Sequence, residues 1–266
     1  LMNPVPYTSG DVFDAVMFYQ AYRPARYFFA RTNTEINAQQ LKDSLLYQWN
    51  RLLPDNRYAM MNTSSTHDSP RLLSDFYNTN KYKFHANPNE DKNYKTGKPD
   101  AEAYIRLKLY LIHLFTIVGA PQIWNGEEMG MWGADDPNCR KPLMWKEYKF
   151  NPETRNNIQP GKKVYDPVAF NQAQFDLYKK LISIRKNNPV LNTGDFKFLV
   201  TDGKKLSYSR SEGNDEIIVM FNLEKDQQKF TLPANTGWTD LMTNKKVTGN
   251  SIVLKPLTAV ILKKIK

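Results

Sequence analysis

A chain of 266 residues, 41% of them hydrophobic, is long enough to bury a core and predicts one or two domains. Its net charge of +10 raises the question of nucleic acids, but the lysines are scattered without a basic helix face or a nucleic-acid motif, so we expect no nucleic-acid partner. No run of about 18 apolar residues occurs, so we expect no membrane span. The single cysteine, Cys139, excludes an internal disulfide and leaves the compartment open between cytoplasm, periplasm and secretion.

Three short apolar runs in the first two thirds of the chain are typical of buried strands. They occupy residues 14–18, 58–62 and 120–124. Stretches with helical periodicity follow them, at residues 37–53, at residues 101–118, and from Pro167 to the residue before Pro189. This alternation of strand and helix predicts a parallel sheet with helical crossovers.

The expected helix starts rest on capping residues. Asn37 and Gln40 have the spacing of a capping box, and Asp166 stands where it can cap a helix beginning at Pro167. Residues 78–100 form a long polar loop, which we expect to be mobile without a ligand.

From about residue 193 the pattern changes to short alternating runs separated by turn residues. The runs are 196–200, 206–211, 217–222, 228–232, 251–254 and 259–262. Such runs predict an antiparallel β-sandwich. We therefore divide the chain into an α/β part, residues 1–190, and a β-sandwich domain, residues 191–266.

A polar motif follows the second predicted strand directly, with His67 and Asp68 at its centre. Catalytic residues of parallel barrels lie at the carboxyl ends of strands, and a His–Asp pair offers a donor ring and an acceptor carboxylate to neighbouring hydroxyls. The structural alternative is that Asp68 or Ser69 caps a helix at Pro70 while His67 lies in the core. The spacing alone leaves both interpretations open.

A second polar segment, residues 126–140, follows the third predicted strand. It contains four acidic residues and ends at Arg140. A metal site, a sugar-binding rim and a solvated loop all fit this composition. Asp136 and Arg140 are one helical turn apart, so an ion pair within the loop is a further alternative.

Together, and in this order, these segments resemble glycoside hydrolase family 13, the α-amylase family, and most closely its neopullulanase, cyclomaltodextrinase and maltogenic amylase members. The matching segments are residues 14–17, 65–71, 119–128 and 135–145. The resemblance covers nearly the whole chain. It implies the C-terminal portion, strands six to eight, of a (β/α)8 TIM barrel, followed by an antiparallel β-sandwich domain.

The resemblance also implies roles for individual residues. Asp68 would be the carboxylate that stabilises the transition state at the cleavage subsite, and His67 would hydrogen-bond the same sugar. Asp136 and Arg140 would bind glucose at or beside that subsite. The implied activity is retaining hydrolysis of α-1,4 bonds, with α-1,6 bonds left open, in maltooligosaccharides, cyclodextrins or pullulan. We expect neither a metal nor a cofactor in this segment, with calcium left open for the missing part, and the oligomeric state stays open.

The sequence departs from the family pattern in one decisive way. Retaining chemistry needs a nucleophilic carboxylate and an acid/base carboxylate about 5 Å apart, and neither motif occurs in these residues. We therefore expect this chain to be inert by itself. The alternative is a non-catalytic α-glucan-binding homologue. Smaller departures at Thr66, at Trp124 with Asn125, and at Glu127 concern the shape of the subsite.

Overall fold

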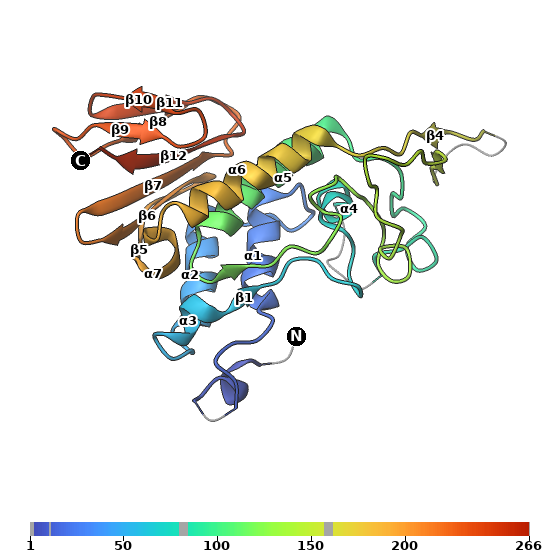
Figure 1. Ribbon diagram of the computed structural model, residues 1–266, viewed down its shortest axis with the longest axis horizontal. Coiled ribbons are helices and arrows are strands. Elements are labelled where there is room, and N and C mark those ends of the chain that lie inside the picture. Colours follow the sequence, from blue (N-terminus) through green and yellow to red (C-terminus); the bar gives the residue numbers. More distant parts are fainter. Residues whose placement is uncertain (1–2, 11, 80–84, 157–161, 266) are drawn as a thin grey trace.

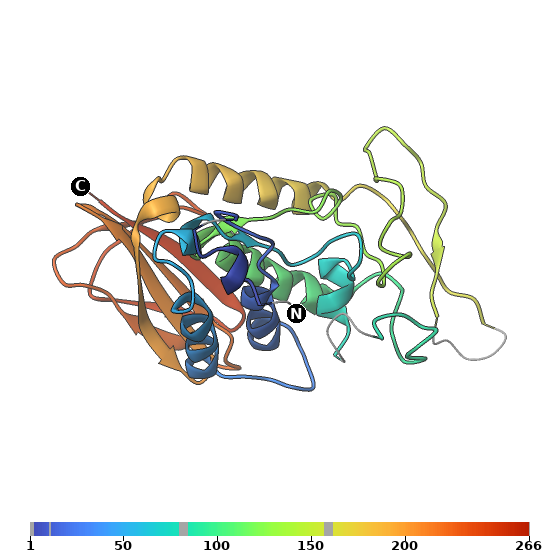
Figure 2. The ribbon, with the colours of Figure 1, turned by 90° about the horizontal axis from the view of Figure 1, so that it is seen from below.

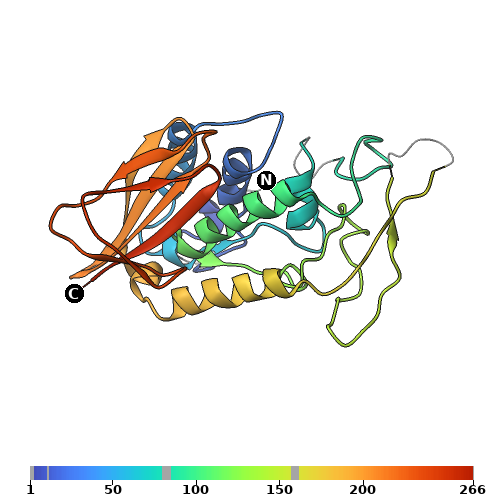
Figure 3. The same ribbon diagram turned by 90° about the horizontal axis from the view of Figure 1, so that it is seen from above.

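The computed structural model describes residues 3–10, 12–79, 85–156 and 162–265. An antiparallel sheet occupies one end of the molecule, helices fill the middle, and irregular segments extend from the other end (Figure 1). Figure 2 and Figure 3 show the same arrangement from below and from above, with two long helices between the sheet and the irregular segments.

The three predicted parallel strands lie side by side in chain order. Met61–Asn62 (β1) pairs in parallel with Ala120–Pro121 (β2), and Met17 forms a parallel bridge to Met61. Each segment is shorter than predicted. Among the described residues, Met17 and β2 have a strand neighbour on one side only, and parallel strands depend on neighbours along both edges.

A short turn precedes these strands, and helices lie between them and after them. They are Val5–Tyr7 (η1, a 3-10 turn), Tyr19–Phe29 (α1), Ala38–Trp49 (α2), Asn56–Ala59 (α3), Leu72–Tyr77 (α4), Ala101–Thr116 (α5), Gln172–Lys186 (α6) and Val190–Thr193 (α7). The capping box of α2 is confirmed: the Gln40 amide donates to Asn37 Oδ1 over 2.8 Å, and the Asn37 amide donates to Gln40 Oε1 over 2.9 Å.

The predicted start of the last long helix was wrong. Helix α6 begins at Gln172, and Asn171 caps it by accepting from the Gln174 amide over 3.1 Å. Asp166 instead belongs to a short hairpin, Glu153–Thr154 (β3) with Tyr165–Asp166 (β4). Its carboxylate is occupied by Arg155, whose Nε donates to it over 2.6 Å, and is therefore not used as a cap.

The second part of the chain forms antiparallel sheets. The strands are Asp195–Asp202 (β5), Lys205–Glu212 (β6), Asp215–Asn222 (β7), Gln228–Thr231 (β8), Trp238–Asp240 (β9), Lys245–Val247 (β10), Ser251–Leu254 (β11) and Thr258–Lys264 (β12). Six of them form one sheet in the order β10-β9-β12-β7-β6-β5, and β8 pairs with β11. The predicted runs all appear as strands, whereas β9 and β10 were missed because three residues are too few for a readable alternation.

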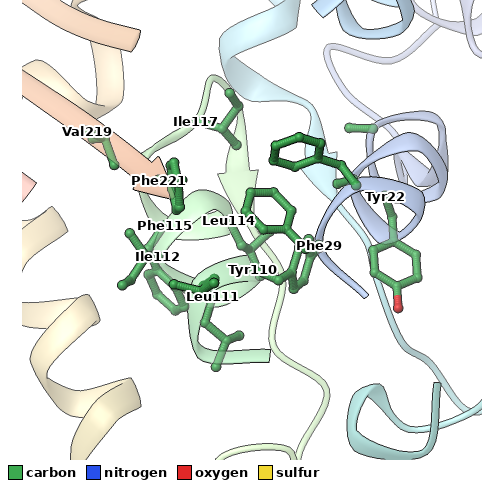
Figure 4. Packing of buried hydrophobic residues seen from close by; sticks show 14 of the residues in the cluster. Tyr22, Phe29, Tyr110, Leu111, Ile112, Leu114, Phe115, Ile117, Val219 and Phe221 are labelled. Atoms are coloured by element: carbon green, nitrogen blue, oxygen red, sulfur yellow. The ribbon is translucent and has the colours of Figure 1, made fainter. Parts of the chain in front are cut away.

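The six-stranded sheet packs against the helices through one of its faces. Along β7, Ile217, Val219 and Phe221 belong to the core that the helices form, whereas Ile218 and Met220 belong to a second cluster with β8 and β11. Figure 4 shows Phe221 and Val219 beside the apolar side chains of α5. Because successive side chains of a strand point to opposite faces, one face of the sheet packs on the helices and the other on β8 and β11. The domain boundary at residue 190 stays a prediction.

Two further expectations concern the periphery. No helix in the described part of the chain has the length and apolarity that a bilayer crossing requires. Residues 80–84 of the long polar loop lie outside the described residues, and its mobility stays a prediction. In its described part, Asn78 Nδ2 donates to the Lys95 carbonyl over 3.1 Å.

Candidate functional site

The polar segments that follow β1 and β2 lie next to each other. Because the two strands are parallel and adjacent, their carboxyl ends meet at the same edge, which is where barrel enzymes carry their catalytic residues. The segments after them run side by side away from the sheet (Figure 1).

His67 and Asp68 are exposed on a loop that is otherwise buried. Thr66 is 4% exposed, and its Oγ1 donates to Asp68 Oδ1 over 2.5 Å. The Tyr19 hydroxyl lies 3.0 Å from the same Thr66 Oγ1. Burial raises the pKa of Tyr19, and the charge of Asp68 adds to this, so the phenol stays neutral and can donate. The loop is thus held from beneath and presents two polar side chains outward.

The structural alternative for this motif is wrong. Helix α4 begins at Leu72 with Arg71 as its N-cap residue and without a side-chain cap, so neither Asp68 nor Ser69 caps it. His67 is exposed and does not lie in the core.

Asp136 and Arg140 form an ion pair that also reaches the first segment. Arg140 Nε lies 2.7 Å from Asp136 Oδ1 and donates to the His67 carbonyl over 3.0 Å. Cys139 Sγ donates to the same carbonyl over 3.2 Å. The Arg140 and Asp136 side chains are 48% and 47% exposed, and an ion pair so exposed contributes little stability. The predicted pairing within the loop is present, and the structure also joins this loop to His67.

Arg71 connects its own loop to the residues just after β2 and to the second polar segment, a role that the sequence analysis missed. Its Nε donates to the Cys139 carbonyl over 2.9 Å, and its Nη1 donates to the Asn125 carbonyl over 3.1 Å. The guanidinium also lies 4.0 Å from the ring centroid of Trp124. The one signal in the sequence is an arginine shortly after a strand end, which says nothing of partners 54 and 68 residues away.

A buried carboxylate accompanies Arg71. Glu127 Oε1 lies 3.8 Å from Arg71 Nη1 and accepts from the Leu72 amide over 3.3 Å. Burial raises the pKa of Glu127 to about 7, although the charge of Arg71 opposes the shift. Burial also lowers the pKa of Arg71. Glu127 is 1% exposed and lies beneath the loops, where it contacts Arg71 and the start of α4.

A metal ion is not needed to explain these contacts. The described residues contain no group of three or more His, Cys, Asp or Glu side chains that could hold one. The expectation that this segment needs no cofactor stays a prediction.

Comparison with known proteins gives the family. Residues 3–194 match the family described as the alpha amylase catalytic domain. The chain belongs to the α-amylase family. It is 30% identical over 260 residues to a cyclomaltodextrinase of Thermoanaerobacter pseudethanolicus, covering 97% of this chain and 37% of that protein. It is 26% identical over 264 residues to neopullulanase 2 of Thermoactinomyces vulgaris, covering 95% and 37%.

The α-amylase fold is also found among solved structures. The ligand-free cyclic α-maltosyl-(1→6)-maltose hydrolase of Arthrobacter globiformis aligns with a TM-score of 0.72 at 20% identity, covering 99% of this chain and 48% of that chain. The chain spans 37% of the length of the cyclomaltodextrinase and 37% of the length of neopullulanase 2. The match places Asp68 and Asp136 inside the family region.

Proposed function

We propose that this chain is the substrate-binding part of an α-glucan hydrolase that cleaves α-1,4 glucosidic bonds with retention. The observation that carries the proposal is the meeting of two exposed polar pairs from the segments that follow adjacent parallel strands, joined where Arg140 Nε donates to the His67 carbonyl over 3.0 Å. Maltooligosaccharides, cyclodextrins and pullulan are the proposed substrates, on the strength of relatives named cyclomaltodextrinase and neopullulanase. Cleavage of α-1,6 bonds is left open.

Each exposed side chain has a chemical task in this proposal. The Asp68 carboxylate stabilises the positive charge that develops on the sugar ring in the oxocarbenium-like transition state. His67 hydrogen-bonds a hydroxyl of the same sugar. Asp136 and Arg140 bind a glucosyl unit beside it, and their mutual ion pair holds the guanidinium fork in one orientation.

The proposal assigns the nucleophile and the acid/base residue to a part of the protein outside these 266 residues. Retaining hydrolysis needs both carboxylates about 5 Å apart, and Asp68 cannot attack the anomeric carbon and protonate the leaving group as well. The relatives of this chain are long enough to supply them, because the chain spans 37% of each.

The proposal is tested by Asp68→Asn in a protein of the relatives' length. We expect kcat for maltotriose to fall at least about a hundredfold, which corresponds to about 3 kcal/mol of transition-state stabilisation. The substitution keeps the shape and one acceptor but removes the charge. Asp176→Asn is the matched control, since Asp176 is an exposed carboxylate on α6, and its kcat should stay at the wild-type value.

Two results would decide against the proposal. A rate for Asp68→Asn close to that of the wild type would show that the Asp68 charge has no part in the reaction. Binding of maltotriose without any hydrolysis by the longer wild-type protein would favour a non-catalytic α-glucan-binding homologue. That second candidate is kept because the nucleophile and acid/base motifs are absent from these residues.

A further inference from the structure

A small pocket opens in the chain segment that continues from Arg140. Its volume is about 150 Å³, and the side chains of Met131, Met144, Phe150 and Val168 form its apolar walls together with Trp132. A cavity of this size admits one six-membered ring, as an engineered cavity that binds benzene shows. The pocket therefore has room for a single ring whose substituents reach out through its mouth.

Polar groups stand at one side of this apolar pocket. Lys141 Nζ lies 2.7 Å from both carboxylate oxygens of Glu153, and both residues line the pocket together with Asn151. Their side chains are 28% and 30% exposed. An ammonium group has three donors and a carboxylate about four acceptor sites, so the ion pair keeps hydrogen-bonding capacity for a ligand.

A buried donor in the pocket wall has no acceptor in the described part of the protein. Trp132 is 3% exposed, and its Nε1–H makes no hydrogen bond to any described residue. A buried N–H without a partner raises the free energy of the folded protein. The same nitrogen exposes almost no surface, so the indole ring lines the pocket while its N–H stays out of reach of a ligand.

The Lys141 ammonium is also partly withdrawn from water. Burial lowers the pKa of Lys141, and the ion pair with Glu153 opposes the shift. The ammonium lies 5.5 Å from the centroid of the Trp132 ring. Charges in such surroundings interact more strongly with a ligand than they do on an open surface.

We infer that this pocket binds one glucosyl unit of an α-glucan, with the pyranose ring between the apolar walls and its hydroxyls on Lys141 and Glu153. The identity of the sugar rests on the proposed function. A purely apolar ligand would desolvate the ion pair of Lys141 and Glu153 and offer it no hydrogen bond in return. A small anion would meet the Glu153 carboxylate, and a cation would meet the Lys141 ammonium. A sugar suits the pocket because it combines apolar ring faces with donors and acceptors at its edge.

The experiment follows the indole N–H of Trp132 by NMR in the 15N-labelled chain. The protein has five tryptophans, so its spectrum contains five indole signals, and Trp132→Phe identifies one of them. On titration with maltotriose we expect the Trp132 signal to shift and to saturate, because the indole lines the pocket and a bound sugar changes its surroundings. Glu153→Gln should weaken the affinity at this site at least about tenfold, because it removes a hydrogen-bonding charge. Glu147→Gln, on an exposed carboxylate of the same segment, is the control and should bind as the wild type does.

The outcomes separate this inference from the proposed function. A Trp132 signal that does not move at maltotriose concentrations far above about 1 mM, the weak end of specific binding, would overturn the inference even if the longer protein cleaves maltotriose. So would a Trp132 signal that saturates in Glu153→Gln at the same maltotriose concentration as in the wild type, because this signal reports on the pocket and not on the site of Asp68. A saturating shift in a protein whose longer form cleaves no glucan would uphold the pocket and refute the proposed hydrolysis.

Discussion

His113 makes the stability of this chain depend on pH. The ring is 3% exposed and lies in the core between helices and sheet, 5.1 Å from the Phe29 ring centroid and 6.3 Å from that of Phe221. Its Nδ1 lies 3.3 Å from the Tyr208 hydroxyl. Burial lowers the pKa of His113 from 6.5 to about 3, because the charged ring would lose its hydration without gaining a carboxylate.

The size of the effect follows from the two pKa values. The unfolded chain takes up a proton on His113 below its ordinary pKa of 6.5, whereas the folded chain does so only near pH 3. Between these values the unfolded state binds one more proton, so the free energy of unfolding falls as the pH falls, by about 1.4 kcal/mol per pH unit. Lowering the pH from 6.5 to 5 should therefore remove about 2 kcal/mol of stability through this residue.

The assay is urea denaturation of wild type and His113→Gln at several pH values between 5 and 8. The substitution removes packing, so we expect a lower stability at pH 8, but the dependence on pH should be flatter by about 2 kcal/mol over the range from 6.5 to 5. His67→Gln, in the exposed loop, controls for the loss of a histidine as such. Parallel curves for wild type and His113→Gln would refute the reasoning.

Two further substitutions test how the parts are joined. Arg210 is fully buried, and its guanidinium donates to the carbonyls of five residues, three of them in α7 and at its C-cap and two at the end of α5. Arg210→Met should lower the free energy of unfolding by about 3 kcal/mol or more, measured by urea denaturation. Lys205→Met, which removes only an ion pair with the exposed Asp202, should lower it by less than about 1 kcal/mol. Gly126 has φ +96°, and a Cβ atom there would lie 3.0 Å from Arg71 Nη1. Gly213 has φ +57° and open space around it, so Gly126→Ala should lower the melting temperature by clearly more than Gly213→Ala. Equal losses of melting temperature would contradict this.

The local features of the fold could be predicted from the sequence. The capping box of Asn37 and Gln40 depends on residues three apart, and the strand runs depend on alternation within a few residues. Elements that depend on distant partners could not be predicted. Helix α1 carries Pro24 in its interior, which disfavours a helix. Its buried Arg26, however, forms an ion pair with Asp75, 49 residues away, at 2.8 Å.

In the candidate site, too, the local features could be predicted from the sequence and the contacts between distant residues could not. Position after a strand end was enough to select His67 and Asp68, but exposure in the folded chain was needed to reject the helix-cap interpretation. The contact of Arg140 with the His67 carbonyl joins residues 73 apart, and only the fold brings them together. Glu153 was not selected at all, because a lone acid in an irregular segment carries no periodic or motif signal.

The most direct test of the central claim is a crystal structure of a protein of the relatives' length with maltotriose bound. We predict that one glucosyl unit is hydrogen-bonded by Asp68 and His67 at about 3 Å. Asp136 and Arg140 should contact the same unit or the next one. Carboxylates of Asp68 and Asp136 that lie farther apart than about two sugar lengths, or at opposite ends of the parallel strands, would contradict the account, since ligands gather at one end of such strands.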